Sequence, residues 1–252
     1  MNSTYSIADY YKLYKLARIR TRSAQDYMIF EQFQSSLILR YFQNWNITLI
    51  NKMVLDLGCG LGGFLKEFSD QGACAVGLDL EIPDPFNAML TRADALSTPF
   101  EANLFDLVFC SSLIEHVPNP NALVEECLRI TRTGGHVYLS FPPFYSMRGG
   151  HQFAPYHLLG EKVALSAYRK RHRRTDGSWI DQRVASRPDS YADAFVNWGL
   201  YRMTIRKCEN ILRQFPVKII DCSTKFSTLN FTRLPLLREF LTWHVQFLVQ
   251  KS

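Results

Sequence analysis

The spacing of hydrophobic and polar positions changes near residue 50. Before that point apolar side chains recur at three- and four-residue spacing, as at Tyr27, Phe30, Phe33, Leu37 and Tyr41. Such spacing gathers apolar side chains on one face of a helix. Residues 1–50 are therefore predicted to form a helical N-terminal cap.

From residue 53 onwards, short apolar runs alternate with helical stretches. Each run ends at a glycine or an acid, which predicts strands buried on both faces. The predicted strands cover 53–57, 75–79, 105–110 and 136–141, and helices are predicted over 63–71 and 122–131. Alternation of this kind is typical of a doubly wound α/β sheet with parallel strands, which we assign to residues 51–144.

The rest of the chain divides into two parts. The regular pattern is lost after Pro142-Pro143, and 145–200 is interpreted as an insertion that covers the mouth of the sheet as a lid for the acceptor. The part 201–252 is predicted to contain a helix over 203–215, a strand over 217–222, a helical insertion over 229–242 and a last strand over 245–250. The final strands indicate an antiparallel closing hairpin. The length of 252 residues suits a single domain.

The segment 54–64, VLDLGCGLGGF, carries the strongest functional signal. It joins a predicted strand to a predicted helix through glycines, which allow positive φ and close approach of a ligand. Gly58, Gly60 and Gly63 match G-x-G-x-x-G, the dinucleotide fingerprint. Asp56, Gly58, Gly60 and Gly62 match D-x-G-x-G-x-G, the loop that binds S-adenosylmethionine (AdoMet).

Charge favours the second template. A dinucleotide brings a pyrophosphate, which is bound by helix N-terminal amides and disfavoured by a nearby carboxylate. AdoMet instead carries a sulfonium and an ammonium group, so Asp56 is suited to it, and the loop contains no lysine or arginine. Asp79 ends the next predicted strand, where a carboxylate can accept from ribose hydroxyls in either cofactor class.

Five motifs in order carry a family resemblance. They are the loop VLDLGCGLGG, the acid Asp79, the segment RADAL around Asp94, the run FDLVFCSSLIEHVP and the segment LRITRTGG. Over 52–141 the chain resembles class I AdoMet-dependent methyltransferases of the broad small-molecule branch. The resemblance implies a Rossmann-like, mostly parallel seven-stranded sheet with an antiparallel last strand.

The resemblance also implies AdoMet as the cofactor. Asp94 would face the adenine amino group. The implied cofactor-binding residues are Asp56, Gly58, Cys59, Gly60, Gly62, Asp79, Leu80, Asp94, Ala95 and Ser111. The turn after the fourth strand reads Cys-Ser-Ser rather than an Asn/Asp-Pro-Pro-Tyr type, which argues against methylation of exocyclic base nitrogens.

Three histidines are candidates for a general base, because histidine has an unperturbed pKa near neutrality. His151 is the first and His157 the second, since both lie in GGHQFAPYH directly after the fifth strand, where ligands bind in such sheets. His116 is the third, and its neighbour Glu115 suggests a structural hinge as the alternative. Simple packing is the alternative for the GGHQFAPYH segment.

The run 169–174, RKRHRR, is the densest cluster of positive charge in a chain with net charge +6. Such runs are usually a solvated face. Alternatives are contacts with a phosphate-bearing acceptor, an anionic membrane surface or RNA.

Composition adds exclusions. None of the six cysteines has the spacing of a metal site or a disulfide framework, so no metal is expected. The N-terminus lacks the apolar core of a signal peptide, and no apolar run approaches the roughly 20 residues of a membrane span. A cytoplasmic protein is expected.

These observations leave three function classes. The first is an enzyme that methylates a hydroxyl oxygen of a small molecule or glycan. The second is an RNA or protein methyltransferase that uses the run 169–174, with nucleic acid the less favoured partner. The third is a non-catalytic AdoMet-binding protein. The oligomeric state stays open.

Overall fold

The computed structural model describes residues 5–81, 89–172, 188–195 and 199–252. The strands are β1 (Met53–Leu57), β2 (Cys74–Asp79), β3 (Met89–Arg92), β4 (Phe105–Ser111), β5 (Thr131–Phe141), β6 (Val217–Thr224) and β7 (Val245–Lys251). The α-helices are α1 (Ile7–Ile19), α2 (Ala24–Asn44), α3 (Gly63–Asp70), α4 (Pro120–Ile130), α5 (Glu161–His172), α7 (Ile205–Leu212) and α8 (Arg238–Leu241). Short 3-10 helices are η1 (Ile114–His116), η2 (His151–Phe153), η3 (Tyr156–Leu159), η4 (Ala192–Phe195) and η5 (Phe231–Arg233).

The strands form one sheet of seven in the order β3-β2-β1-β4-β5-β7-β6. Along this order, neighbouring strands from β3 through β2, β1 and β4 to β5 are parallel to one another. β7 is antiparallel to both β5 and β6. The predicted Rossmann-like sheet with an antiparallel last strand is therefore confirmed.

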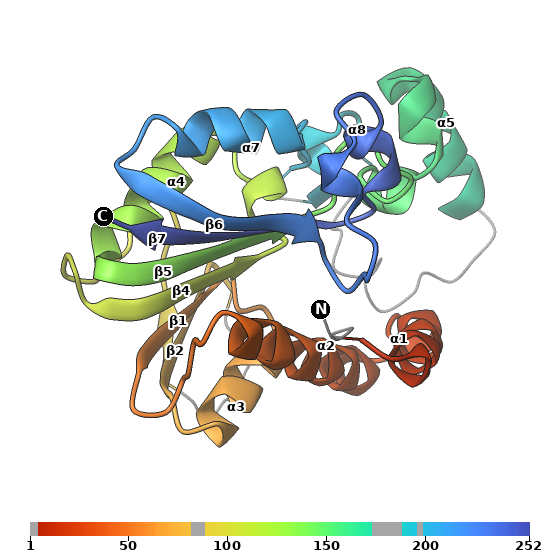
Figure 1. The fold of residues 1–252 in the computed structure, drawn as a ribbon. Coiled ribbons are helices and arrows are strands. Elements are labelled where there is room, and N and C mark those ends of the chain that lie inside the picture. Colours follow the sequence, from red (N-terminus) through yellow and green to blue (C-terminus); the bar gives the residue numbers. More distant parts are fainter. Residues whose placement is uncertain (1–4, 82–88, 173–187, 196–198) are drawn as a thin grey trace.

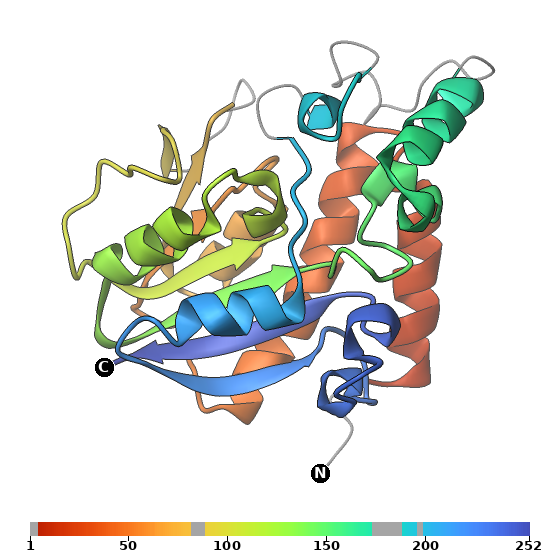
Figure 2. The ribbon, with the colours of Figure 1, turned by 90° about the horizontal axis from the view of Figure 1, so that it is seen from above.

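Helices cover both faces of this sheet, as Figure 1 shows, with α2 and α3 on one face and α4 and α7 on the other. Alternation along β1 explains the two layers, because neighbouring side chains of a strand point to opposite faces. Val54 packs with Leu37 of α2, while Leu55 packs in the cluster that contains Leu123 of α4 and Ile211 of α7. Viewed from above in Figure 2, α1 and α2 flank the same end of the sheet as α5.

Capping residues explain where two helices begin. Asn119 accepts from the Ala122 amide and Pro120 occupies the first turn, so α4 starts before the predicted residue 122. Thr204 accepts from the Lys207 amide, so α7 starts after the predicted residue 203.

The structure differs from the predicted local structure at three places. The helical insertion over 229–242 contains only η5 and the four-residue α8, and Pro235 between them cannot continue a helix. β3 was not foreseen, because its four residues are too few to show a pattern. β5 begins at Thr131 instead of 136, because an irregularity in its pairing with β4 accommodates the extra residues.

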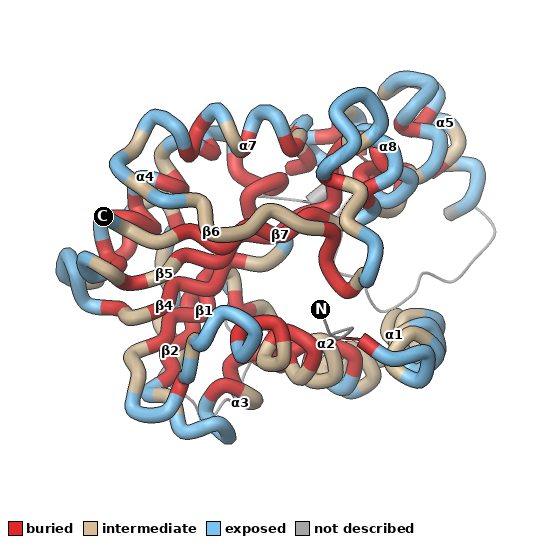
Figure 3. Tube along the Cα trace, in the orientation of Figure 1, coloured by how far each residue is buried: buried red, intermediate tan, exposed pale blue. Residues whose placement is uncertain are grey.

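The insertion over 145–200 has more regular structure than its sequence suggested, since its described residues contain α5 and three 3-10 helices. It also has an apolar cluster of its own, in which Phe153, Leu165, Tyr168 and Tyr191 are buried. Figure 3 shows that buried residues concentrate in the sheet and the helices against it, whereas much of α5 is exposed. Among the described residues, no helix combines the length and hydrophobicity needed to cross a bilayer.

Candidate active site

The glycine loop joins β1 to α3 at the carboxyl edge of the parallel strands. Gly58, Gly60 and Gly62 have φ of +79°, +52° and +77°, a region that favours glycine. A Cβ atom on Gly60 would meet nothing within 4 Å, so open space lies beside the loop. The three glycines with positive φ are the ones that the D-x-G-x-G-x-G template requires.

Gly63 serves packing instead. A Cβ atom there would lie 2.5 Å from Cβ of Glu31, so α2 can approach the start of α3 only because the residue is glycine. Glu31 is buried, and it accepts a backbone hydrogen bond from Gly63. Sequence reasoning missed Glu31, which lies within the apolar face of α2 and had no motif to distinguish it.

Three buried carboxylates surround the loop. Asp56 lies in β1, Asp79 ends β2 and accepts from the Gly60 amide at 2.8 Å, and Glu31 comes from α2. Burial and the neighbouring Asp79 raise the pKa of Asp56 to about 8. Burial and Asp56 raise the pKa of Glu31 to about 8. The raised pKa values show that burial disfavours the ionised carboxylates, which a cationic ligand would stabilise.

The other predicted cofactor residues lie near this edge with varied exposure. Asp94 is exposed and accepts from the Leu96 amide at 2.9 Å, which stabilises the turn after β3. Ala95 and Cys59 are buried, and burial raises the pKa of the Cys59 thiol. Leu80, directly after β2, is 40% exposed.

Ser111, the last residue of β4, takes part in a buried polar contact that the sequence did not reveal. Nζ of Lys225 donates to Ser111 Oγ at 2.9 Å and to Ser140 Oγ at 3.1 Å. Lys225 follows β6 directly and is 1% exposed. Burial lowers its pKa to about 7, although Glu115 and Glu31 oppose that shift.

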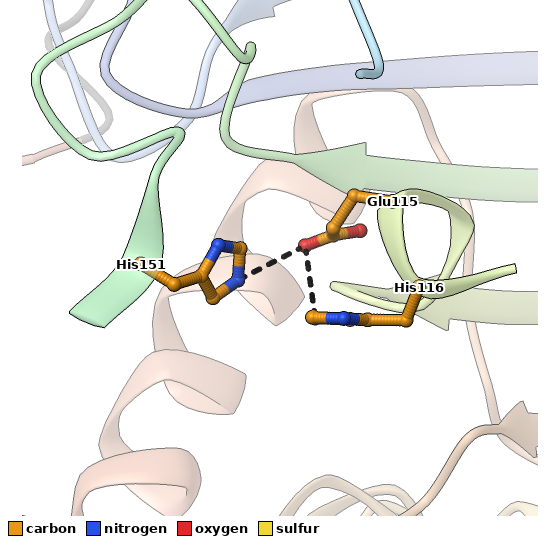
Figure 4. A group of neighbouring side chains, drawn as sticks. All are labelled: Glu115, His116 and His151. Atoms are coloured by element: carbon orange, nitrogen blue, oxygen red, sulfur yellow. Dashed lines mark ion pairs between the residues drawn. The ribbon is translucent and has the colours of Figure 1, made fainter. Parts of the chain in front are cut away.

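Glu115, His116 and His151 form a cluster at the same edge of the sheet, shown in Figure 4. Oε1 of Glu115 lies 3.9 Å from Nε2 of His116 and 3.7 Å from Nε2 of His151. The first two residues come from η1, after β4, and His151 begins η2, after β5. Because β4 and β5 are neighbours in the sheet, residues 35 positions apart meet here.

Burial dominates the electrostatics of this cluster. It raises the pKa of Glu115 to about 8 and lowers the pKa of His116 to about 4. Burial, with the nearby His116, also lowers the pKa of His151. The rings of His151 and His116 meet in a T-shaped arrangement, with centroids 4.9 Å apart.

His157 lies apart from this cluster. Its Nε2 donates to the carbonyl oxygens of Phe144 at 2.8 Å and Ser146 at 3.1 Å, and the side chain is buried. These bonds connect η3 to the segment that follows β5.

The positively charged run is partly described. Arg169 pairs with Asp189 at 2.5 Å, and Arg171 donates to the Gln152 carbonyl at 3.4 Å. Arg173 and Arg174 lie outside the described residues.

Comparisons with known proteins support the resemblance to methyltransferases. A family model described as a methyltransferase domain matches residues 55–139. An uncharacterised methyltransferase of Mycobacterium tuberculosis H37Rv is 34% identical over 133 residues, which cover 49% of this chain and 52% of that protein. A second, from Mycobacterium leprae TN, is 32% identical over 162 residues, covering 60% of this chain and 58% of that protein. The chain thus spans between half and three fifths of these relatives.

Over residues 55–139 this chain matches the methyltransferase domain family. Solved structures of AdoMet-dependent methyltransferases share the fold of this chain at low sequence identity. An AdoMet-dependent methyltransferase from Mesorhizobium loti has a TM-score of 0.54 at 18% identity, covering 84% of this chain and 96% of that one. One from Clostridium acetobutylicum has a TM-score of 0.58 at 12% identity, covering 86% and 90%.

The family match implies AdoMet as the cofactor, and the carboxyl edge fits it. Oδ2 of Asp56 and Oε2 of Glu31 are buried without a hydrogen-bond partner among the described residues. Buried polar atoms normally have partners, and cationic or hydrogen-donating groups of a ligand would supply them. Asp79 is placed at the end of β2, where the family's ribose acid is expected.

Proposed function

We propose that this methyltransferase transfers the methyl group of AdoMet to a hydroxyl oxygen of a small-molecule or glycan acceptor. The observation that carries the proposal is the buried cluster of Glu115, His116 and His151 at the carboxyl edge that also holds the glycine loop. A polar cluster at that edge can position and deprotonate an acceptor hydroxyl.

AdoMet supplies a methyl group on a positively charged sulfur, which makes it an activated donor. The main task of the protein is therefore to align the acceptor, and alignment contributes up to roughly 7–11 kcal/mol in well-oriented systems. The acceptor oxygen forms its bond to the methyl carbon as the carbon–sulfur bond breaks, and the hydroxyl proton must leave. We propose that His151 assists loss of that proton.

The position of His151 favours it over the two other histidines. It is 23% exposed, whereas His116 and His157 are buried. His157 also directs Nε2 to main-chain carbonyls, so a role in holding the lid suits it better. His116 donates through Nδ1 to the Gly199 carbonyl and supports the cluster from within.

The alternatives make different demands on the chain. An RNA or protein acceptor would use the run 169–174, but Arg169 is already paired with Asp189. A non-catalytic AdoMet-binding protein would not require polar groups beside the cofactor edge. Both alternatives remain outcomes of the test below.

The test is a transfer assay with methyl-labelled AdoMet. Hydroxylated metabolites, sugars, structured RNA and proteins would each be offered, with the His151→Ala variant in parallel. We expect label in a hydroxylated small molecule or sugar and a strong loss with the variant. Label in RNA with steep salt dependence would support a polyanionic acceptor instead. AdoMet binding without transfer to any acceptor would support the non-catalytic alternative.

A further inference from the structure

The atoms of Glu115, His116 and His151 that face one another are all potential metal ligands. One oxygen of Glu115 and one nitrogen from each ring lie within 4.8 Å of one another. The separations of 3.7 and 3.9 Å from Oε1 to the two Nε2 atoms are too long for hydrogen bonds, which are lost beyond about 3.5 Å. Direct hydrogen bonds therefore do not account for the convergence seen in Figure 4.

The hydrogen bonds at Nδ1 of His116 and His151 orient the Nε2 lone pairs of both rings toward the same point. Nδ1 of His116 lies 2.8 Å from the Gly199 carbonyl oxygen, and Nδ1 of His151 lies 3.4 Å from the Gly149 carbonyl oxygen. A carbonyl oxygen only accepts, so Nδ1 carries the proton in each ring. In a neutral ring Nε2 then presents its lone pair toward Glu115. Metal-binding histidines are typically fixed in this way by a backbone carbonyl.

Glu115 supplies a second, independent observation. Its side chain is 2% exposed, and neither carboxylate oxygen has a hydrogen-bond partner in the part of the chain that the structure describes. Burying such a carboxylate is costly unless a cation or donors compensate for it. A cation held between the carboxylate and the two Nε2 atoms would provide that compensation.

The backbone holds His151 in place for this role. His151 has φ of +50°, a conformation that non-glycine residues rarely adopt, and it lies directly after Gly149-Gly150. A Cβ atom on Gly150 would lie 2.2 Å from the ring of His157, so the loop is tightly packed on that side. His157 thus supports the loop that carries His151.

We propose that Glu115, His116 and His151 bind one divalent transition-metal cation, which holds the acceptor hydroxyl beside the cofactor. Two imidazoles and one carboxylate form a site with open positions, which suits first-row cations such as Mn²⁺ or Zn²⁺ rather than Mg²⁺. The role of the cation in holding the acceptor hydroxyl rests on the proposed function, whereas binding of the cation does not. A cation in this place lowers the pKa of a bound hydroxyl, and the proton leaves to water. His151 then acts as a ligand rather than as the proton acceptor.

The first experiment measures binding without activity. The full chain is treated with a chelator, dialysed, and titrated with Mn²⁺, with free Mn²⁺ followed by electron paramagnetic resonance. We expect one Mn²⁺ per chain, and binding weakened by at least about tenfold in Glu115→Gln and in His151→Gln, since loss of even an outer-shell partner costs about 10–100-fold. His136→Gln is the matched control, because His136 lies within β5 away from the cluster, and it should bind as the unmodified chain does.

Two results would overturn the inference: no Mn²⁺ or Zn²⁺ bound at millimolar concentration, or equal binding in Glu115→Gln and the unmodified chain. AdoMet affinity measured on each variant shows that it is folded. The transfer assay separates this inference from the proposed function. Full methyl transfer by metal-free protein would overturn the cation and leave His151 as the proton acceptor. Specific Mn²⁺ binding without transfer to any hydroxyl would support the cation and contradict the proposed function.

Discussion

The proposed cofactor side and the proposed acceptor side of this chain are built in different ways. The cofactor side takes most of its residues from two adjacent strand ends, β1 and β2, and from the loop between β1 and α3. The proposed acceptor side gathers Glu115 and His116 after β4 and His151 from the insertion after β5. The proposed cofactor residues therefore lie in short continuous segments, whereas the proposed acceptor residues come together only through long-range packing.

The insertion 145–200, which carries His151, has an apolar cluster separate from the two clusters that pack against the sheet. This separation adds to the difference between the two sides. Phe153, in the same 3-10 helix as His151, contacts Tyr168 and Tyr191 with ring centroids 5.1 Å away in each case. Changes in this cluster should therefore affect the acceptor side without affecting the cofactor side.

The largest expected effect is on catalysis. His151→Ala should lower kcat by about 10²–10⁴-fold, because it removes the side chain that assists loss of the acceptor proton. AdoMet affinity should change little, since His151 is not part of the glycine loop. Steady-state kinetics and calorimetry on the same preparation check both statements. An unchanged kcat would remove His151 from the acceptor side.

The second test disturbs the lid alone. Phe153→Ala should destabilise the lid by about 3–5 kcal/mol, because Phe153 is 1% exposed and its loss leaves a cavity among aromatic rings. Hydrogen exchange should rise in η2 and α5, and the KM for the acceptor should increase. AdoMet affinity is the internal control. If AdoMet binding fell as much as acceptor binding, the two sides would not be independent.

The third test disturbs the cofactor side alone. Asp79→Ala should weaken AdoMet binding about 10- to 100-fold, through loss of charge-assisted hydrogen bonds worth roughly 1.5–3 kcal/mol. The melting temperature without AdoMet should change less than the affinity, although the Gly60 amide loses its acceptor. Calorimetry and thermal unfolding measure the two effects. Unchanged affinity would show that Asp79 does not contact the cofactor.

A smaller effect concerns pH. The pKa of Glu31 is about 8 in the folded chain against an ordinary value of 4.5, so the folded state binds the proton more tightly than the unfolded state. Stability from this group is present below pH 4.5 and is lost as the pH rises toward 8. Glu31→Gln should therefore raise the melting temperature of the AdoMet-free protein by a few degrees above pH 8, and change it little below pH 4.5. A variant that is less stable at high pH would contradict this prediction.

The smallest effect is expected for the charged run. Replacing Arg171, Arg173 and Arg174 with Gln should leave turnover of a small acceptor nearly unchanged, because such runs are usually solvated. Turnover at two salt concentrations is the measurement. A large loss that depends on salt would indicate a polyanionic acceptor and extend the acceptor side beyond the lid.

Much of the cofactor side could be predicted from the sequence. The apolar run 53–57 became β1, and the positive φ of Gly58, Gly60 and Gly62 matches the template chosen from charge. These features are local, because a buried strand and a tight loop each impose their pattern on neighbouring residues. The fold class followed from the same local alternation.

The tertiary structure alone decided the partners of these segments. The sequence does not show that Glu31 approaches Gly63 or that Lys225 reaches Ser111. Nor does it show that the histidine facing Glu115 is His151 and not His157. Each contact joins residues far apart in the chain, and it depends on which strands are neighbours and how helices pack on them. The periodicity of a segment records which side is buried, but it carries no information about which distant side chain lies opposite.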